Sequence, residues 1–218
     1  MNYILKTLPH DGKSYNDFQW ALEVGATVEA PDWNPEPKCG GGLHGWLDGL
    51  GDGSIGHIQK EGCLWLVLEA DEVVSIDNEK VKFPNCKILH IGDRLSATKF
   101  LRNLRPSVVG MIGESIEVGD KQYAIVGDYG KATAGNFGTA TAGFRGTATA
   151  GDYGTATAGN FGTATAGYEG TATAGEGGII NIKYWDSGRY KILTGYIGED
   201  GLEPNTPYRV QDGKFVKA

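Results

Sequence analysis

Apolar and polar residues alternate in an eight-residue pattern through the second half of the chain. Over residues 127–174 six copies follow one another: GDYGKATA, GNFGTATA, GFRGTATA, GDYGTATA, GNFGTATA and GYEGTATA. Each copy joins a Gly-x-x-Gly corner, where glycine permits positive φ, to a segment of period two such as Thr-Ala-Thr-Ala. The pattern predicts short strands between turns, with Thr facing outward and Ala facing a narrow interior.

The repeat continues in phase into more apolar octads at both ends, residues 119–126 and 175–182. A short fixed period with altered end units is typical of a capped solenoid, so we expect a β-solenoid over residues 119–182. Two octads per coil would give four coils. Three octads per coil are the alternative, because residues 127–150 and 151–174 differ at only three positions. That spacing would place Arg145 over Glu169 and Asn136 over Asn160, but an interior of Ala alone would leave a void in a triangular coil, so two octads are preferred.

Six corner residues are aromatic and form the candidate interaction surface. They are Tyr129, Phe137, Phe144, Tyr153, Phe161 and Tyr168. In the third and sixth octads the aromatic residue stands one position earlier, which directs it to another side of the corner. The rings either stack on one another, which is the preferred interpretation, or form an exposed patch for a partner.

Residues 1–118 have the mixed pattern of a small α+β domain. Strands are expected at residues 3–7, 27–30, 63–69, 73–76 and 82–89. Turn signals stand at residues 9–12 and at Asp77-Asn78-Glu79. Two short helices are expected. One follows a glycine turn at residues 43–50, and the other covers residues 96–104, where Ser96 can cap the helix and Pro106 stops it.

Residues 183–218 predict a β-rich C-terminal cap on the solenoid. Short alternating strands are expected at residues 183–186, 190–196, 208–211 and 214–216. Asp212-Gly213 is a favoured hairpin turn. Such a cap would cover strand edges that could otherwise pair with another molecule. Its aromatic residues, Trp185, Tyr190, Tyr196 and Tyr208, could instead mediate assembly, and we expect a homo-oligomer.

Composition and charge narrow the classes of function. Glycine accounts for 35 of 218 residues, and the net charge is −7. Residues 1–118 carry 11 Lys and Arg against 17 Asp and Glu. The sequence therefore lacks a basic patch, and we expect no direct binding of nucleic acid. Three cysteines make no disulfide framework, and no apolar run suggests a membrane span or secretion signal. We expect a cytoplasmic protein with no membrane partner.

Candidate chemistry is sparse. One set of residues has types that bind zinc: Cys39, His44, Cys86 and His90. Their spacing is looser than that of known zinc sites, so no metal is expected. A Gly-Leu-His turn at His44 is similar to the nucleotide-binding loops of ADP-ribosyltransferase-like folds, whose other residues cannot be assigned here. Cys39 and His44 are therefore kept only as a candidate N-terminal pocket. The sequence has no P-loop, dinucleotide fingerprint or Ser/His/Asp set, so we expect no catalytic residues and no cofactor.

The repeat resembles the octapeptides of bacterial ice nucleation proteins, with their Ala-Gly-Tyr-Gly-Ser-Thr-x-Thr pattern, and more loosely the heads of trimeric autotransporter adhesins. In ice-binding solenoids, ranks of outward Thr-x-Thr are thought to match ice. Five such pairs occur here: Thr139/Thr141, Thr147/Thr149, Thr155/Thr157, Thr163/Thr165 and Thr171/Thr173. Divided between two faces they would make two or three rungs each, a small area for ice binding.

The flanking segments are similar to an uncharacterised domain of phage and bacterial proteins. The similarity lies in residues 18–25, in Cys39-Gly40-Gly41-Gly42-Leu43-His44, in residues 64–69 and in the tail at 195–210. The turn contains one more glycine than the Cys-x-x-Gly-x-His pattern of those proteins, and Leu43 stands before the histidine. The resemblance implies a phage or prophage accessory protein and carries no known activity.

Together these features favour a non-enzymatic binding module or scaffold in the host cytoplasm. Its most specific form is a phage accessory protein that binds and inhibits a host protein, such as a defence complex, through its acidic N-terminal domain or its corner aromatics. Three alternatives remain: a structural or assembly protein of a virion or surface, a weak ice-binding protein, and an ADP-ribosyltransferase-like enzyme.

Overall fold

The protein is described by a computed structural model over residues 1–76 and 80–218. The turn expected at Asp77-Asn78-Glu79 lies outside the described residues. The chain divides into two compact units, residues 1–112 and 113–218, and each is described by itself.

The N-terminal unit is mainly β, and the α+β expectation was therefore only partly correct. Its antiparallel sheet has the strand order β2-β7-β4-β1-β3-β6-β5. The strands are β1 (Asn2–Leu8), β2 (Thr27–Glu29), β3 (Leu43–Leu47), β4 (Leu64–Ala70), β5 (Val74–Ile76), β6 (Lys80–Phe83) and β7 (Asn85–Gly92). Two 3₁₀ turns (Tyr15–Asp17 and Gly53–Ile55) and the helix α1 (Arg94–Leu104) complete the unit as described. One face of the sheet buries Ile4 and Leu8, and the other buries Leu5 and Val67 under α1.

The helix expected at residues 43–50 was wrong. Residues 43–47 form β3, which pairs with β1 through Ile4↔Leu47 and with β6 through Leu43↔Phe83. Gly45 explains the close pairing, because a Cβ there would lie 2.3 Å from Cγ2 of Ile4. Glycine also disfavours a helix interior, so sheet pairing prevails over the short helical pattern.

The single strand expected at residues 82–89 was also wrong. Pro84 separates β6 from β7, since proline has no N–H for the ladder. β6 pairs with β3 and β5, whereas β7 pairs with β4 and β2. The strands expected at residues 3–7, 27–30, 63–69 and 73–76 are confirmed within one residue.

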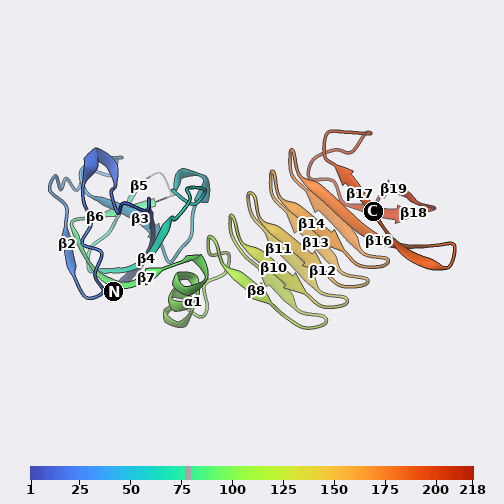
Figure 1. The fold of residues 1–218 in the computed structure, drawn as a ribbon, viewed down its shortest axis with the longest axis horizontal. Helices are drawn as coiled ribbons and strands as arrows, with labels where there is room; N and C mark the ends of the chain where they lie inside the picture. The colour runs from blue at the N-terminus through green and yellow to red at the C-terminus, as the bar shows by residue number, and fades with distance from the viewer. Residues whose placement is uncertain (77–79) are drawn as a thin grey trace. The chain divides into compact units, whose positions relative to one another are not determined.

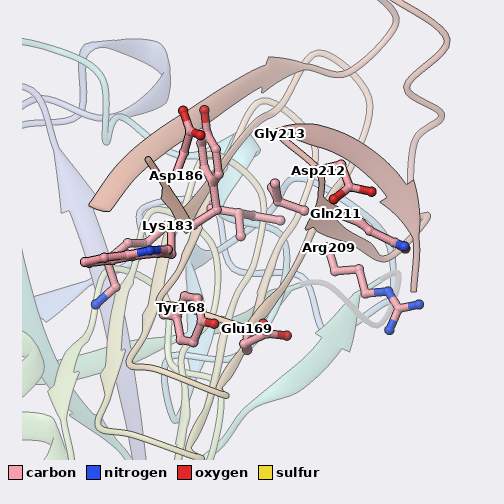
Figure 2. Close-up of a pocket in the computed structure, with 12 residues that line it drawn as sticks. Tyr168, Glu169, Lys183, Asp186, Arg209, Gln211, Asp212 and Gly213 are labelled. Carbon is pink, nitrogen blue, oxygen red and sulfur yellow. The ribbon is translucent and has the colours of Figure 1, made fainter. Parts of the chain in front are cut away.

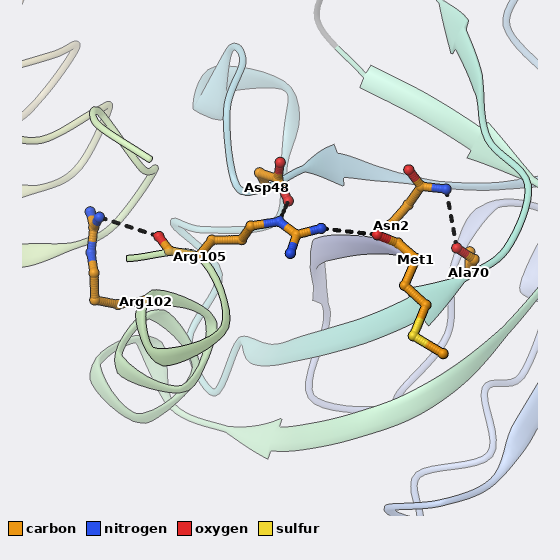
Figure 3. A network of polar contacts seen from close by, with 6 residues as sticks. All are labelled: Met1, Asn2, Asp48, Ala70, Arg102 and Arg105. Atoms are coloured by element: carbon orange, nitrogen blue, oxygen red, sulfur yellow. Dashed lines mark hydrogen bonds and ion pairs between the residues drawn. The ribbon is translucent and has the colours of Figure 1, made fainter. Parts of the chain in front are cut away.

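The second expected helix is confirmed as α1, with an earlier start. Asp93 is its N-cap rather than Ser96, and Oδ1 of Asp93 accepts a hydrogen bond of 2.7 Å from the Ser96 amide. Just after the helix, Arg105 donates to Oδ1 of Asp48 and to the Met1 carbonyl, both at 2.9 Å (Figure 3). These bonds fix the C-terminal end of α1 to the sheet.

The second unit contains the expected β-solenoid, about four turns between residues 115 and 182 (Figure 1). Two parallel stacks form its faces. The first contains β8 (Ser115–Glu117), β10 (Lys131–Ala134), β12 (Thr147–Ala150), β14 (Thr163–Ala166) and β16 (Ile179–Asp186). The second contains β9 (Tyr123–Ile125), β11 (Thr139–Ala142), β13 (Thr155–Ala158) and β15 (Thr171–Ala174).

The strand register confirms two octads per coil. Thr147 pairs with Thr163 and Thr139 with Thr155, so each residue lies beside the one 16 positions later. The alternating alanines fill the space between the sheets, and Ala140, Ala148 and Ala156 are completely buried. A coil with only methyl groups inside must be flat, because close packing allows no central void.

The corners differ from expectation in their backbone. Positive φ falls on the third residue of each corner, for example Tyr129 (φ 56°) and Phe137 (φ 55°), and on none of the glycines from 127 to 175. The glycines are required by close approach instead. A Cβ at Gly135 would lie 2.3 Å from Oδ1 of Asp120 and 2.7 Å from the Asp120 amide nitrogen.

The strands expected after the solenoid are confirmed. β16 continues beyond the last coil and pairs with β17 (Arg189–Tyr196), while β18 (Tyr208–Gln211) and β19 (Lys214–Lys217) form a hairpin around Asp212-Gly213. β18 joins the second stack antiparallel to β15. Larger apolar side chains close the core at this end: Ile180, Ile182, Ile197, Leu202 and Tyr208.

Candidate functional site

The coil length separates the six corner aromatics into two rows. Corners 16 residues apart lie over one another, so Phe137, Tyr153 and Tyr168 share one edge of the solenoid. Tyr129, Phe144 and Phe161 share the opposite edge and form what we term the short row. On the first edge the row continues into the β16–β17 hairpin through Tyr190 and Trp185, and we term these five residues the long row.

Neighbouring rings of the long row are in contact throughout. Phe137 and Tyr153 stack with ring planes 6° apart and centroids 4.9 Å apart. Edge-to-face contacts continue the row from Tyr153 to Tyr168 at 6.0 Å, from Tyr168 to Tyr190 at 5.6 Å, and from Tyr190 to Trp185 at 4.9 Å. In the short row Phe144 lies 5.7 Å from Tyr129 and 5.9 Å from Phe161, both edge-to-face.

These rings are exposed as well as stacked. Phe137 is 57% exposed, Tyr153 is 52% exposed, and Phe161 of the short row is 56% exposed. Trp185 and Tyr190 are each 54% exposed. Stacking therefore orders the rings without covering them. Docking of a partner on this surface stays a prediction.

The second residue of most corners holds the rows in register. Oδ1 of Asp120 accepts from the Asn136 amide at 2.7 Å, and Oδ1 of Asn136 accepts from the Asp152 amide at 2.9 Å. Asp128, Asp152 and Asn160 make the same bond to the residue 16 positions later. We term this set the Asx ladder. This ladder was not predicted from the sequence, although Asp or Asn recurs directly after the corner glycine.

The threonines form flat ranks on both faces, as expected. The face of β11, β13 and β15 has three complete Thr-x-Thr rungs, and the face of β12 and β14 has two. Threonines lie ~6.7 Å apart along a strand and ~4.8 Å apart between strands. Lys131 precedes the second set, and Ile179 and Asn181 follow it, so that face is less regular.

A cavity of about 660 Å³ lies where the long row meets the C-terminal hairpins (Figure 2). Tyr168 and Glu169 of a corner face the ends of β16 and of the β18–β19 hairpin across it, and its walls include Trp185, Arg209 and Asp212. Lys183 binds Asp152 at 2.5 Å, and this hydrogen bond lowers the pKa of the Asp152 carboxyl. Mixed charges line this cavity, so it has no clear preference for one ligand charge.

The structure does not bring Cys39, His44, Cys86 and His90 together. His44 is on β3 and Cys86 on β7, with β1 and β4 between them in the sheet. Cys86 is buried, which raises the pKa of its thiol to about 12, and His90 stacks on Phe100 at 5.1 Å. In residues 1–76 and 80–218 no three His, Cys, Asp or Glu side chains form a metal-binding group. Cys39 is exposed, whereas His44 lines a cavity with Lys6 and Lys80.

Comparisons with known proteins bear on the repeats. Ice nucleation protein InaU of Pantoea ananas is 30% identical over 109 residues, which cover 49% of this chain and 10% of that protein. An ice nucleation protein of Pseudomonas syringae pv. syringae is 35% identical over 101 residues, 45% of this chain and 8% of that protein. The chain is similar to bacterial ice nucleation proteins. This confirms the resemblance of the repeats, although the chain spans a tenth or less of the length of these relatives.

No family model and no solved structure matches the chain. The similarity of the N-terminal segment to a phage and bacterial domain therefore stays an expectation. In the described part of the chain no helix is long and apolar enough to cross a membrane.

Proposed function

We propose that this is a non-enzymatic scaffold protein that binds a partner protein through the long aromatic row. The observation that carries the proposal is the continuous contact of five rings, four of which are more than half exposed. Tyr and Trp are enriched at the energetic centres of protein interfaces. Because stacking already orders these rings, they would lose little further side-chain entropy when a partner binds to them.

Two Phe residues provide a matched test. Phe137 of the long row and Phe161 of the short row both occupy the third corner position, with φ of 55° and 56° and nearly equal exposure. Asn is among the residues that tolerate this backbone conformation best, so replacement by Asn removes the ring without adding strain. We expect Phe137→Asn with Tyr153→Asn to abolish retention of a stoichiometric partner on the immobilised full chain, and Tyr129→Asn with Phe161→Asn to leave it unchanged.

The same experiment separates the other interpretations. Equal retention by both variants would contradict the long row as the binding surface. If the immobilised wild-type chain retains only further copies of itself, light scattering should show a homo-oligomer. That result would favour a structural or assembly role over partner binding. The narrower hypothesis of a phage accessory protein that inhibits a host protein rests on the N-terminal resemblance and on the acidic residues 1–118.

Ice binding is a second candidate function, favoured by the Thr ranks and by the ice nucleation relatives. The face of β11, β13 and β15 would be used, since its three rungs are uninterrupted. We expect the wild-type chain to alter ice-crystal habit weakly, because its rank is short. Thr157→Lys in the central rung should abolish the effect, while Thr149→Lys on the opposite face should preserve it. Unaltered crystals with the wild-type chain would exclude this function.

A further inference from the structure

A second cavity, of about 530 Å³, lies in the N-terminal unit and has no part in the proposed function. Lys6, His44 and Lys80 line it from β1, β3 and β6, which are neighbours in the sheet. Trp20, His57 and the glycine turn at residues 40–42 complete much of the wall. The volume is in the range of small-molecule sites.

Three ammonium groups lie in or beside this cavity, and their protein partners are carbonyls and aromatic rings. Nζ of Lys6 donates to the His44 carbonyl at 2.9 Å and lies 4.9 Å from the Trp20 ring. Nζ of Lys80 donates to the Ile55 carbonyl at 3.0 Å. Lys82 is completely buried and donates to the carbonyls of Lys38 and Gly40. No carboxylate among the described residues forms an ion pair with any of the three.

The positive charge of the cavity contrasts with its surroundings. Residues 1–118 carry 17 acidic side chains, yet Asp32 is the one acid in the described lining, and its Oδ1 already accepts from the Gly42 amide. Burial, followed by the charge of Lys80, lowers the pKa of Lys6 to about 8. Burial, followed by the charges of Lys6, Lys80 and Lys82, lowers the pKa of His44 to about 4. His44 is therefore neutral at pH 7.

His44 provides an independent indication of a ligand. Its Nε2 is buried and has no hydrogen-bond partner among the described residues. A buried polar group without a partner is unfavourable, and in native proteins such atoms are usually satisfied by protein, water or ligand. His44 lines the same cavity as Lys6 and Lys80, which form no ion pair with a carboxylate of the described residues.

We propose that this cavity binds a phosphorylated small molecule, with the ammonium groups of Lys6 and Lys80 and Nε2 of His44 donating to the phosphate oxygens. Phosphate presents several strong acceptor oxygens and up to two charges, which suits two ammonium groups and a further donor better than a single carboxylate does. Lys82 is a positioning residue, because it binds carbonyls of the loop that lines the cavity. Phe18 and Trp20, in edge-to-face contact at 6.0 Å, form the apolar wall for the rest of the molecule.

The test is calorimetric titration of the full chain with inorganic phosphate, adenosine 5′-monophosphate and adenosine at constant ionic strength. We expect phosphate and the nucleotide to bind and adenosine not to bind. Equal affinities would identify free phosphate as the ligand, and tighter binding of the nucleotide would indicate a phosphorylated organic molecule. Lys6→Met and Lys80→Met should each weaken phosphate binding at least tenfold, while Lys87→Met, an exposed lysine of the same sheet, should not.

Two results would overturn the proposal. One is the absence of binding of any phosphate probe to the wild-type chain, and the other is equal binding by Lys6→Met, Lys80→Met and Lys87→Met. Circular dichroism shows whether each variant is folded. A second readout is the ¹⁵N shift of Nε2 in His44, which should move on adding phosphate to the wild-type chain and remain fixed in Lys6→Met.

Discussion

At the third position of each corner, side chains occupy the left-handed backbone region at a cost of ~1 kcal/mol each. Four of these six residues are aromatic: Tyr129, Phe137, Tyr153 and Phe161. A contact between two rings contributes about as much in return. Replacement by Asn should therefore leave stability nearly unchanged, which makes these positions suitable for testing function separately from folding.

The buried ammonium group of Lys6 makes the stability of the protein depend on pH. Its pKa is about 8 in the folded protein against 10.5 for an unperturbed side chain, so the fold disfavours the charged form. The free energy of unfolding should rise, relative to that of Lys6→Met, as the pH increases from 8 to 10.5, by up to ~3 kcal/mol. His44, Lys80 and Cys86 are present in both proteins, so the comparison with Lys6→Met removes most of their contribution to the pH dependence. Urea unfolding at pH 7, 9 and 10.5 measures it, and a constant difference would contradict the assignment.

Hydrogen bonds of the Asx ladder connect successive coils of the solenoid. The coils also approach one another closely at the corner glycines, where most positions have no room for a Cβ. The ladder explains why either Asp or Asn recurs at the second corner position: each supplies Oδ1 to the backbone amide 16 residues later. Phe144 and Tyr168 stand at that position and have no such side-chain acceptor. The ring contacts of these two residues within the rows are edge-to-face, whereas Phe137 and Tyr153, both at the third position, are stacked.

Asn136→Ala tests the ladder. Loss of Oδ1 leaves the Asp152 amide without its 2.9 Å acceptor, and we expect a loss of ~1 kcal/mol in unfolding free energy. Glu176→Ala is the control, because Glu176 has the same corner position where no further coil is stacked. Similar losses in urea unfolding of the two variants would show that the ladder contributes nothing.

Gly135→Ala and Gly119→Ala test the close approach of corners, since they occupy the same corner position one coil apart. A Cβ at Gly135 would lie 2.3 Å from Asp120, whereas a Cβ at Gly119 meets nothing nearer than 3.9 Å. Neither glycine has positive φ. Thermal unfolding should show a loss of at least ~2 kcal/mol for Gly135→Ala and almost none for Gly119→Ala. Equal losses would indicate that conformational freedom, rather than contact, requires these glycines.

For the whole solenoid unit, stability depends on its ends. The repeated coils bury little more than methyl groups, which contribute little at ~25 cal/mol per Å². The larger apolar residues lie at the C-terminal end. Tyr208 of β18 pairs with Ala172 of β15, and Leu202 belongs to the same buried core. A short alanine solenoid is thus stabilised by the hairpins that cover it.

A chain ending at residue 186 tests this dependence. It lacks β17, β18 and β19, so the last strands of both stacks lose their antiparallel partners. We expect aggregation in light scattering and loss of the thermal transition of the solenoid unit, while the transition of residues 1–112 is retained. A chain ending at residue 211 keeps β17 and β18 and should remain soluble. A stable monomer from the shorter chain would contradict the role of the hairpins.

The sequence by itself determined the period of the repeat, the alternation of Thr and Ala, the two faces of the solenoid and the β hairpins that follow, because each depends on residues within one or two octads. It did not determine the backbone at the corners, where contacts from the next coil decide which residue adopts positive φ. Only the tertiary structure showed that Gly45 belongs to a strand and that Lys6, His44 and Lys80 line one cavity. Those residues are up to 74 positions apart, and the order of antiparallel strands that joins them is set by long-range packing that no local pattern contains.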